Sequence, residues 1–188
     1  APQALQWSPE YGRQAPAERN QISSQECAHD GRCYAKALIG RNGHRLWPEA
    51  MSILREYWSQ LPRKSRYNVQ LHRQENKFAD WDCSAEGFEG IRAQDILPLL
   101  IQRFDFELFM GFANIIDPFI GRSFGPNFDA DSAQDRAFID RVHARDQAEI
   151  LAGRIKPTHM TAVMRQRPFA QLRCWQHLTP TFCLRPPT

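Results

Sequence analysis

The sequence predicts a single α/β domain in which short strands alternate with amphipathic helices. The chain has 188 residues, the usual length of one domain. Its composition, with 42% hydrophobic and 24% charged residues, is that of an ordinary globular protein. Segments with the two-residue period of a strand also alternate along the chain with segments that have the 3.6-residue period of a helix.

The N-terminal third of the chain is predicted to contain one strand and one helix. Residues 1–30 are polar and lack regular periodicity, so we expect a loose N-terminal arm. Arg32–Ile39 is short, partly apolar and flanked by glycines, which favours a strand. Pro48 suits the first position of a helix, where a missing N–H removes no hydrogen bond. Apolar residues then recur at three- and four-residue spacing as far as Leu61, and Pro62 ends the helix.

The middle of the chain is predicted to contain a long loop, a helix and a strand. Residues 63–90 are polar with scattered aromatic side chains and are expected to form the loop. A helix is expected at about Gln94–Arg103. Beyond it, Phe106, Leu108 and Met110 alternate with other residues, which is the period of a strand. We therefore expect these three side chains to belong to a central, buried strand.

The C-terminal third is predicted to contain a long helix, a last strand and a tail. Asp131 is expected to cap the helix, and Gly153 is a natural stop for it. Thr158–Met164 is the expected last strand. Residues 167–188 are rich in Pro, Cys, Arg and Trp without periodicity, so we expect an irregular tail. The folded half-domain would then span residues 31–166.

The charge and hydropathy patterns exclude two classes of partner. The net charge is only +3, and the 24 basic and 21 acidic residues are interspersed, so no nucleic-acid-binding surface is expected. No apolar run approaches the roughly 20 residues that span a bilayer, so no membrane association is expected. The five cysteines are odd in number and widely spaced. Reduced thiols in a cytoplasmic protein are the simplest interpretation.

Cysteine and histidine residues lie near each other in the sequence at three places where metal or thiol chemistry could occur. These are Cys27 with His29 and Cys33, Cys174 with His177, and Cys83 with His72. A structural zinc site needs four ligands, usually in two compact pairs, whereas the first two groups lie at opposite ends of the chain. No metal site is therefore predicted. The third group could form a thiol–imidazole pair, but a packed cysteine is the more common outcome.

Five strings of residues follow one another in an order that resembles a known enzyme family. They are IGRNGHRLWPEA (Ile39–Ala50), the WD pair (Trp81, Asp82), EGIRAQDILPLL (Glu89–Leu100), FDFELFMGFANIIDPF (Phe104–Phe119) and FIDRVHARDQAEILAGRIKPTHM (Phe138–Met160). Over about residues 31–166 the chain resembles the C-terminal half of class I, Rossmann-like methyltransferases that depend on S-adenosylmethionine (SAM). The resemblance implies a partial Rossmann-like fold, with about three strands in a mixed sheet, three or more helices and irregular termini.

The resemblance also implies a strand arrangement and a cofactor. The first strand would be the fifth strand of the family's sheet, and the last two would form the antiparallel pair that closes the sheet edge. The family binds SAM at a glycine-rich turn after its first strand, with an acidic residue after the second. Residues 1–30 contain one glycine, Gly12, and are too short to hold the missing strands and crossovers. SAM is thus the cofactor by resemblance only, and no cofactor-binding residue is assigned in this chain.

Polar and aromatic residues gather between the first strand and the first helix, where ligands bind in open α/β sheets. The resemblance places the acceptor pocket here too. Candidate substrate-binding residues are Arg41, Asn42, Trp47, Trp81 and Asp82, with His44 as the candidate catalytic base. The structural alternative is that Asn42 and Gly43 form a turn while Trp47 and Trp81 only pack against their neighbours.

The function implied by the resemblance is methyl transfer from SAM to an unknown small-molecule or sugar-type acceptor, with no activity expected from the isolated chain. The alternative is a non-catalytic binding or interaction module derived from a methyltransferase. The strand at Arg32–Ile39 would lack its usual neighbour, so self-association through an exposed sheet edge is expected. The compositional shift at residues 1–30 and 167–188 also leaves open a remnant of a misread coding region.

Overall fold

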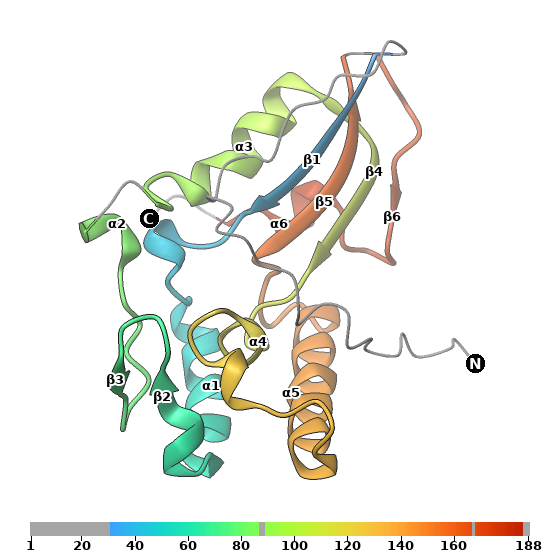
Figure 1. Ribbon diagram of the computed structural model, residues 1–188. Coiled ribbons are helices and arrows are strands. Elements are labelled where there is room, and N and C mark those ends of the chain that lie inside the picture. The colour runs from blue at the N-terminus through green and yellow to red at the C-terminus, as the bar shows by residue number, and fades with distance from the viewer. Residues whose placement is uncertain (1–30, 87–88, 167, 186–188) are drawn as a thin grey trace.

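The structure, a computed structural model, describes residues 31–86, 89–166 and 168–185, and it is a mixed α/β fold (Figure 1). The expected N-terminal arm, residues 1–30, lies outside the described residues. The described chain forms a four-stranded mixed sheet in the order β1-β5-β4-β6. Its strands are β1 (Arg32–Leu38), β4 (Asp105–Phe112), β5 (His159–Arg165) and β6 (Arg173–Cys174). Strand β5 is antiparallel to both β1 and β4, and β6 is parallel to β4.

The three predicted strands and three predicted helices are all present in the structure. The helices are α1 (Pro48–Gln60), α3 (Ala93–Arg103) and α5 (Ala133–Leu151). Helix α1 begins at its proline, as expected. The cap of α5 is Ser132 rather than Asp131, because the Ser132 hydroxyl accepts the backbone N–H of Asp135 at 3.3 Å. Gly153 follows α5 with a φ of +71°, the left-handed conformation that suits glycine after a helix.

A β-bulge in β4 changes which of its side chains face the core. Phe106 lies opposite Met164 and Leu108 lies opposite Val163, so Glu107 is the extra residue between them. Beyond the bulge Phe109 is fully buried, whereas Leu108 is half-buried and Met110 is 43% exposed. The expectation that Phe106, Leu108 and Met110 are all buried is therefore wrong for the last two, because one inserted residue exchanges the two faces of a strand.

Contacts from neighbouring strands hold the bulge in place. Glu107 accepts hydrogen bonds from Arg32 Nε at 3.0 Å and from Arg165 Nε at 2.8 Å. These two guanidinium groups hold the pKa of the Glu107 carboxyl at about 2, well below its ordinary value. Glu107 therefore stays ionised and paired at neutral pH.

Two hydrophobic clusters form the core. The first lies on the inner face of the sheet, where residues of α3 and of α6 (Pro180–Cys183) pack against the strands. The second is rich in aromatic side chains and joins α1, α5 and α4 (Asp117–Ile120) below the sheet in Figure 1. Trp58 is at its centre, with its ring centroid 4.8 Å from Phe124 and 5.2 Å from Phe78. Both clusters meet near the end of β4, where the site described below is found.

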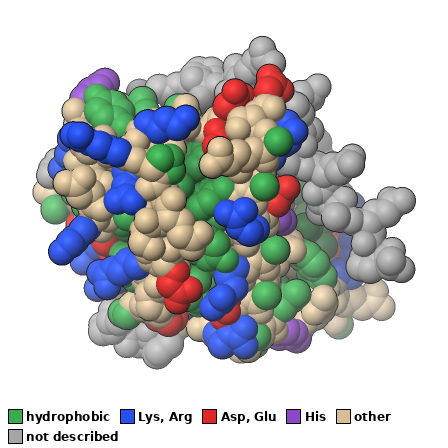
Figure 2. Space-filling model, turned by 90° about the horizontal axis from the view of Figure 1, so that it is seen from below, with side chains coloured by type: hydrophobic (Ala, Val, Ile, Leu, Met, Phe, Trp, Pro, Cys, Tyr) green, Lys and Arg blue, Asp and Glu red, His purple; other side chains and the backbone are tan. Residues whose placement is uncertain are grey.

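The long loop and the tail contain short regular elements. Residues 63–90 include the hairpin of β2 (Tyr67–Asn68) and β3 (Arg73–Gln74) and the short α2 (Cys83–Glu86). The tail contains β6 and α6, and Arg185 beyond them forms an ion pair with Glu49 of α1. No helix among the described residues has the length and hydropathy needed to cross a membrane. Basic side chains occur at several separate places on the face shown in Figure 2.

Candidate functional site

The carboxyl ends of β1 and β4 lie at one end of the sheet. These two strands are parallel to each other, because each is antiparallel to β5 between them. The loop after β1, the turn after β4 and the first residue of β5, His159, therefore meet at this end. Ligands of open α/β sheets bind at such an edge.

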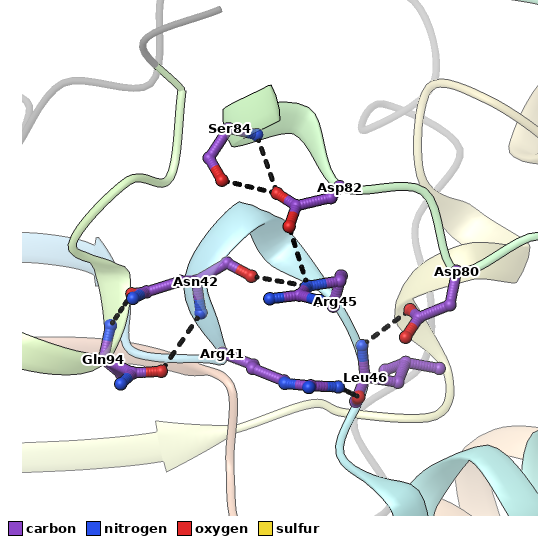
Figure 3. A network of polar contacts seen from close by, with 8 residues as sticks. All are labelled: Arg41, Asn42, Arg45, Leu46, Asp80, Asp82, Ser84 and Gln94. Carbon is purple, nitrogen blue, oxygen red and sulfur yellow. Dashed lines mark hydrogen bonds and ion pairs between the residues drawn. The ribbon is translucent and has the colours of Figure 1, made fainter. Parts of the chain in front are cut away.

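The loop after β1 is held by a network of polar contacts to α3 and to the segment before α2 (Figure 3). The backbone N–H of Asn42 donates to Gln94 Oε1 at 3.4 Å, and Asn42 Oδ1 accepts the N–H of Gln94 at 3.3 Å. Arg45 Nε lies 3.2 Å from Asp82 Oδ2. The N–H of Leu46 donates to Asp80 Oδ1 at 2.8 Å. The network fixes the backbone that carries His44.

Three of the candidate substrate-binding residues take part in these structural contacts. Arg41 donates to the Leu46 carbonyl at 3.4 Å, and Asn42 pairs with α3. Asp82 accepts the side-chain and backbone hydrogen bonds of Ser84, which lower the pKa of its carboxyl. A Cβ added at Gly43 would lie 1.8 Å from Asp82 Oδ1, so Asp82 fills the space above that turn.

The two candidate tryptophans lie in different environments. Trp47 is buried, with the Arg185 guanidinium 4.4 Å and the Arg41 guanidinium 5.8 Å from its ring centroid. These are cation–π contacts that attach the C-terminal tail to the start of α1. Trp81 is exposed on the segment before α2.

His44, the candidate base, lies at the centre of the site in a strained conformation. Its φ is +57°, which is uncommon for a residue with a side chain. A Cβ at Gly90 would lie 3.0 Å from His44 Nε2, so the imidazole packs directly on that glycine. Burial lowers the pKa of His44, although the nearby Glu89 carboxylate opposes the effect.

A histidine–carboxyl pair that the sequence reasoning missed lies at the same end of the sheet as the loop that carries His44. His159 Nδ1 is 3.1 Å from Asp117 Oδ2, and the Thr158 hydroxyl donates to the Ala113 carbonyl at 3.0 Å. The His159 ring stacks on Phe112 with centroids 5.6 Å apart. Burial, together with the charges of Lys36 and His44, lowers the pKa of His159 to about 4. His159 is therefore neutral at pH 7.

His159 Nδ1 lies 3.1 Å from two oxygen atoms, Asp117 Oδ2 and Thr158 Oγ1. The Thr158 hydroxyl donates to the Ala113 carbonyl and an ionised carboxyl can only accept, so both oxygens suit the tautomer that carries its proton on Nδ1 and keeps a lone pair on Nε2. Desolvation, together with the nearby Asp146, raises the pKa of Asp117 to about 7, although 34% of its side chain is exposed. Both groups thus resist charge: His159 is neutral at pH 7, and the Asp117 carboxyl titrates near neutral pH. In its ionised form the Asp117 carboxyl is close enough to orient the imidazole, as carboxylates orient histidine bases.

Asp146 of α5 supports the pair from below. It is 1% exposed, and its oxygens accept the backbone N–H groups of Ile115 at 2.8 Å and Asn114 at 3.2 Å. Burial raises the pKa of Asp146 to about 7, while these backbone hydrogen bonds oppose the shift. Asp146 therefore holds the turn between β4 and α4 in place, and Asp117 begins α4 directly after this turn.

One sequence signal pointed to Asp146 but not to the pair. Asp146 lies four residues after Val142 and four before Ile150, both of which are buried. A carboxylate on the apolar stripe of a helix needs buried partners, so this spacing marks a polar site. No comparable local pattern connects Asp117 with His159, because Asp117 begins α4 and His159 begins β5, which are distant in the sequence.

The Asp117→Asn variant should gain stability relative to the wild type as pH rises. The pKa of Asp117 is raised from 3.8 to about 7 in the folded chain, so between these values the folded chain binds a proton that the unfolded chain releases. The stability from this proton is complete below about pH 4 and is lost as pH rises through about 7. The asparagine variant has no such proton.

Urea denaturation of both proteins at a series of pH values measures this effect. The pKa of His159 is lowered in the folded chain, so its titration changes stability with pH in the opposite direction to that of Asp117. This change occurs in the wild type and in the variant alike, so the difference between their free energies of unfolding reports on Asp117. Asp140→Asn, at an exposed position of α5, is the control and should show a constant difference from the wild type. A constant difference for Asp117→Asn as well would show that this carboxyl has an ordinary pKa.

The described residues do not have the arrangement that a metal ion or SAM would need at this site. They contain no group of three or more His, Cys, Asp or Glu side chains placed to hold a metal ion. A nucleoside cofactor binds where a glycine, which has no side chain, lets the cofactor approach the backbone closely. At this site the space above Gly43 is filled by Asp82 and that above Gly90 by His44, so these glycines do not fit SAM. No protein-family model matches the chain, and neither the curated proteins nor the solved structures that were searched include a match.

Proposed function

We propose that this chain is a methyltransferase-related protein whose described residues bind the methyl acceptor. The observation that carries the proposal is the Asp117–His159 pair, 3.1 Å apart at the carboxyl ends of β1 and β4. The strand arrangement also supports it. The resemblance expects the last two strands to pair antiparallel; β4 and β5 are antiparallel, and they form the middle of the four-stranded sheet with β6 beyond β4.

His159 takes the role of general base in this proposal. Its Nε2 accepts a proton from an acceptor hydroxyl or amine while Asp117 holds the ring and stabilises the imidazolium that forms. His44, on the loop after β1, is a second group proposed to bind the acceptor. The lowered pKa values of both imidazoles favour their neutral forms, and a neutral imidazole can accept a hydrogen bond from the hydroxyl of a small-molecule or sugar-type acceptor.

The proposal assigns no step to SAM in the described residues. The glycine turns near His44 are filled by side chains, so the methyl donor has no cradle there. The alternative function, a non-catalytic binding module, uses the same residues without proton transfer. A cytoplasmic setting is also proposed, supported by Cys83, Cys174 and Cys183, which are free thiols.

Two titrations test the proposal. In calorimetry, SAM and S-adenosylhomocysteine should show no saturable binding to the chain, and a micromolar dissociation constant would show that it has a donor site. In saturation-transfer NMR, a panel of methyl glycosides and substituted phenols should include ligands that shift the His159 ring resonances. His159→Gln should abolish those contacts, whereas His143→Gln, at an exposed position of α5, should not. Binding that survives His159→Gln would support the non-catalytic module, and a panel without ligands would contradict the acceptor site.

A further inference from the structure

We propose that two copies of this chain pair through antiparallel contact of their β1 strands, which joins the two sheets into one. This inference is independent of the proposed acceptor site. In the described part of the chain, β1 is the terminal strand of the sheet and pairs only with β5 (Figure 1). The unpaired edge of a strand is a template for another strand.

The hydrogen-bond pattern shows which residues of β1 present their backbone to that edge. Ile39, one residue beyond β1, lies opposite Thr158, and its N–H donates to the Thr158 carbonyl at 2.7 Å. Backbone groups alternate in direction along a strand. The N–H and C=O groups of Ala37 and Ala35 therefore point toward β5, and those of Lys36 and Tyr34 point away from it, toward the open edge.

One register of two β1 strands fits both this pattern and the side chains. With the two-fold axis at Ala35, Tyr34 of each copy lies opposite Lys36 of the other, and each such pair exchanges both of its hydrogen bonds. On the outer face, the 45% exposed Tyr34 ring meets an exposed lysine, which is a favourable cation–π pair. On the inner face, Cys33 lies opposite Ala37, and these small side chains leave room for close approach.

Charge disfavours the neighbouring register. Centring the two-fold axis on Lys36 would place two lysines directly opposite each other, which is destabilising. The Ala35-centred register instead separates the lysines and gives each an aromatic partner. The interface is isologous, so both favourable pairs form together in a dimer.

Sedimentation velocity of the full chain over a concentration series tests the association. We expect a reversible monomer–dimer equilibrium. Tyr34→Lys places lysine opposite Lys36 twice and should raise the dissociation constant about ten-fold or more. Met110→Lys is the matched control, because Met110 is equally exposed on the outer face but lies on β4, and it should leave dimerisation unchanged. Circular dichroism confirms that each variant is folded.

Cysteine cross-linking tests the register. A mixture of Tyr34→Cys and Lys36→Cys chains should form a disulfide between positions 34 and 36 under mild oxidation, identified by mass spectrometry. Tyr34→Cys alone should not cross-link at position 34.

A dimer insensitive to Tyr34→Lys would place the interface elsewhere. A monomer at all concentrations, with slow amide exchange at Tyr34 and Lys36, would show that the same chain covers the edge; a monomer with fast exchange there would leave the edge unpaired. Each of these outcomes overturns the proposal.

Discussion

Phe109→Ala should lower the free energy of unfolding by about 3–5 kcal/mol, the usual cost of removing a fully buried phenylalanine. Phe109 is 0% exposed and is one of the largest side chains of the inner-face core. Its ring packs edge-on against Phe106 with centroids 5.6 Å apart. The ring also lies under Gly111, where an added Cβ would be 3.2 Å from it. The surrounding strands cannot close over the space left by alanine, so a cavity remains.

Leu108→Ala is the matched control on the same strand. Leu108 is half-buried on the outer face, so truncation leaves a surface dimple and should cost only about 1 kcal/mol. Urea denaturation followed by circular dichroism measures both variants. A larger loss for Leu108→Ala than for Phe109→Ala would mean that the strand keeps its regular alternation and that the bulge at Glu107 is absent.

This contrast shows where sequence reasoning about the fold stops. The helices could be predicted because their signals are local: Pro48 at the start of α1, apolar spacing along it, and glycine after α5. The bulge could not, because Glu107 is held by Arg32, 75 residues away, and by Arg165, 58 residues away. The alternation of Phe106, Leu108 and Met110 suggests an uninterrupted strand, and only the pairing with β5 shows the inserted residue.

The candidate site divides in the same way. Arg41, Asn42 and His44 were identified because the loop after a strand in an α/β sheet is a common ligand position, and the structure places them at that edge. The Asp117–His159 pair was missed because its members, at the starts of α4 and β5, are brought together only by the sheet topology. Asp146 lies within an otherwise apolar stripe and could have been found from its helix alone. The contacts that could not be predicted are therefore those between residues far apart in the sequence, whatever the chemistry of their side chains.

Asp146→Ala should be the other strongly destabilising substitution. It removes the acceptor of the backbone N–H groups of Asn114 and Ile115, both of which are 0% exposed. A buried donor left without an acceptor costs about 1–3 kcal/mol, so the two together should cost about 2–6 kcal/mol. A water molecule admitted to the vacated space would bring the cost toward the lower end of this range.

Asp146→Asn separates the loss of hydrogen bonds from the loss of volume. The amide keeps one acceptor oxygen but turns its NH₂ group toward one of the two backbone donors, so its cost should lie between those of the wild type and Asp146→Ala. Asp140→Ala, at an exposed position of α5, should change stability by less than about 0.5 kcal/mol.

Because Asp146 fixes the turn that precedes Asp117, loss of the Asp146 carboxylate should also release His159 from its 3.1 Å contact with Asp117. A looser turn should also expose the His159 ring to water and so relieve the burial that lowers its pKa, and NMR titration should then show a pKa closer to the ordinary value of 6.5 than to about 4. A His159 pKa that stays near 4 in a folded Asp146→Ala chain would show that the turn holds its shape without the carboxylate.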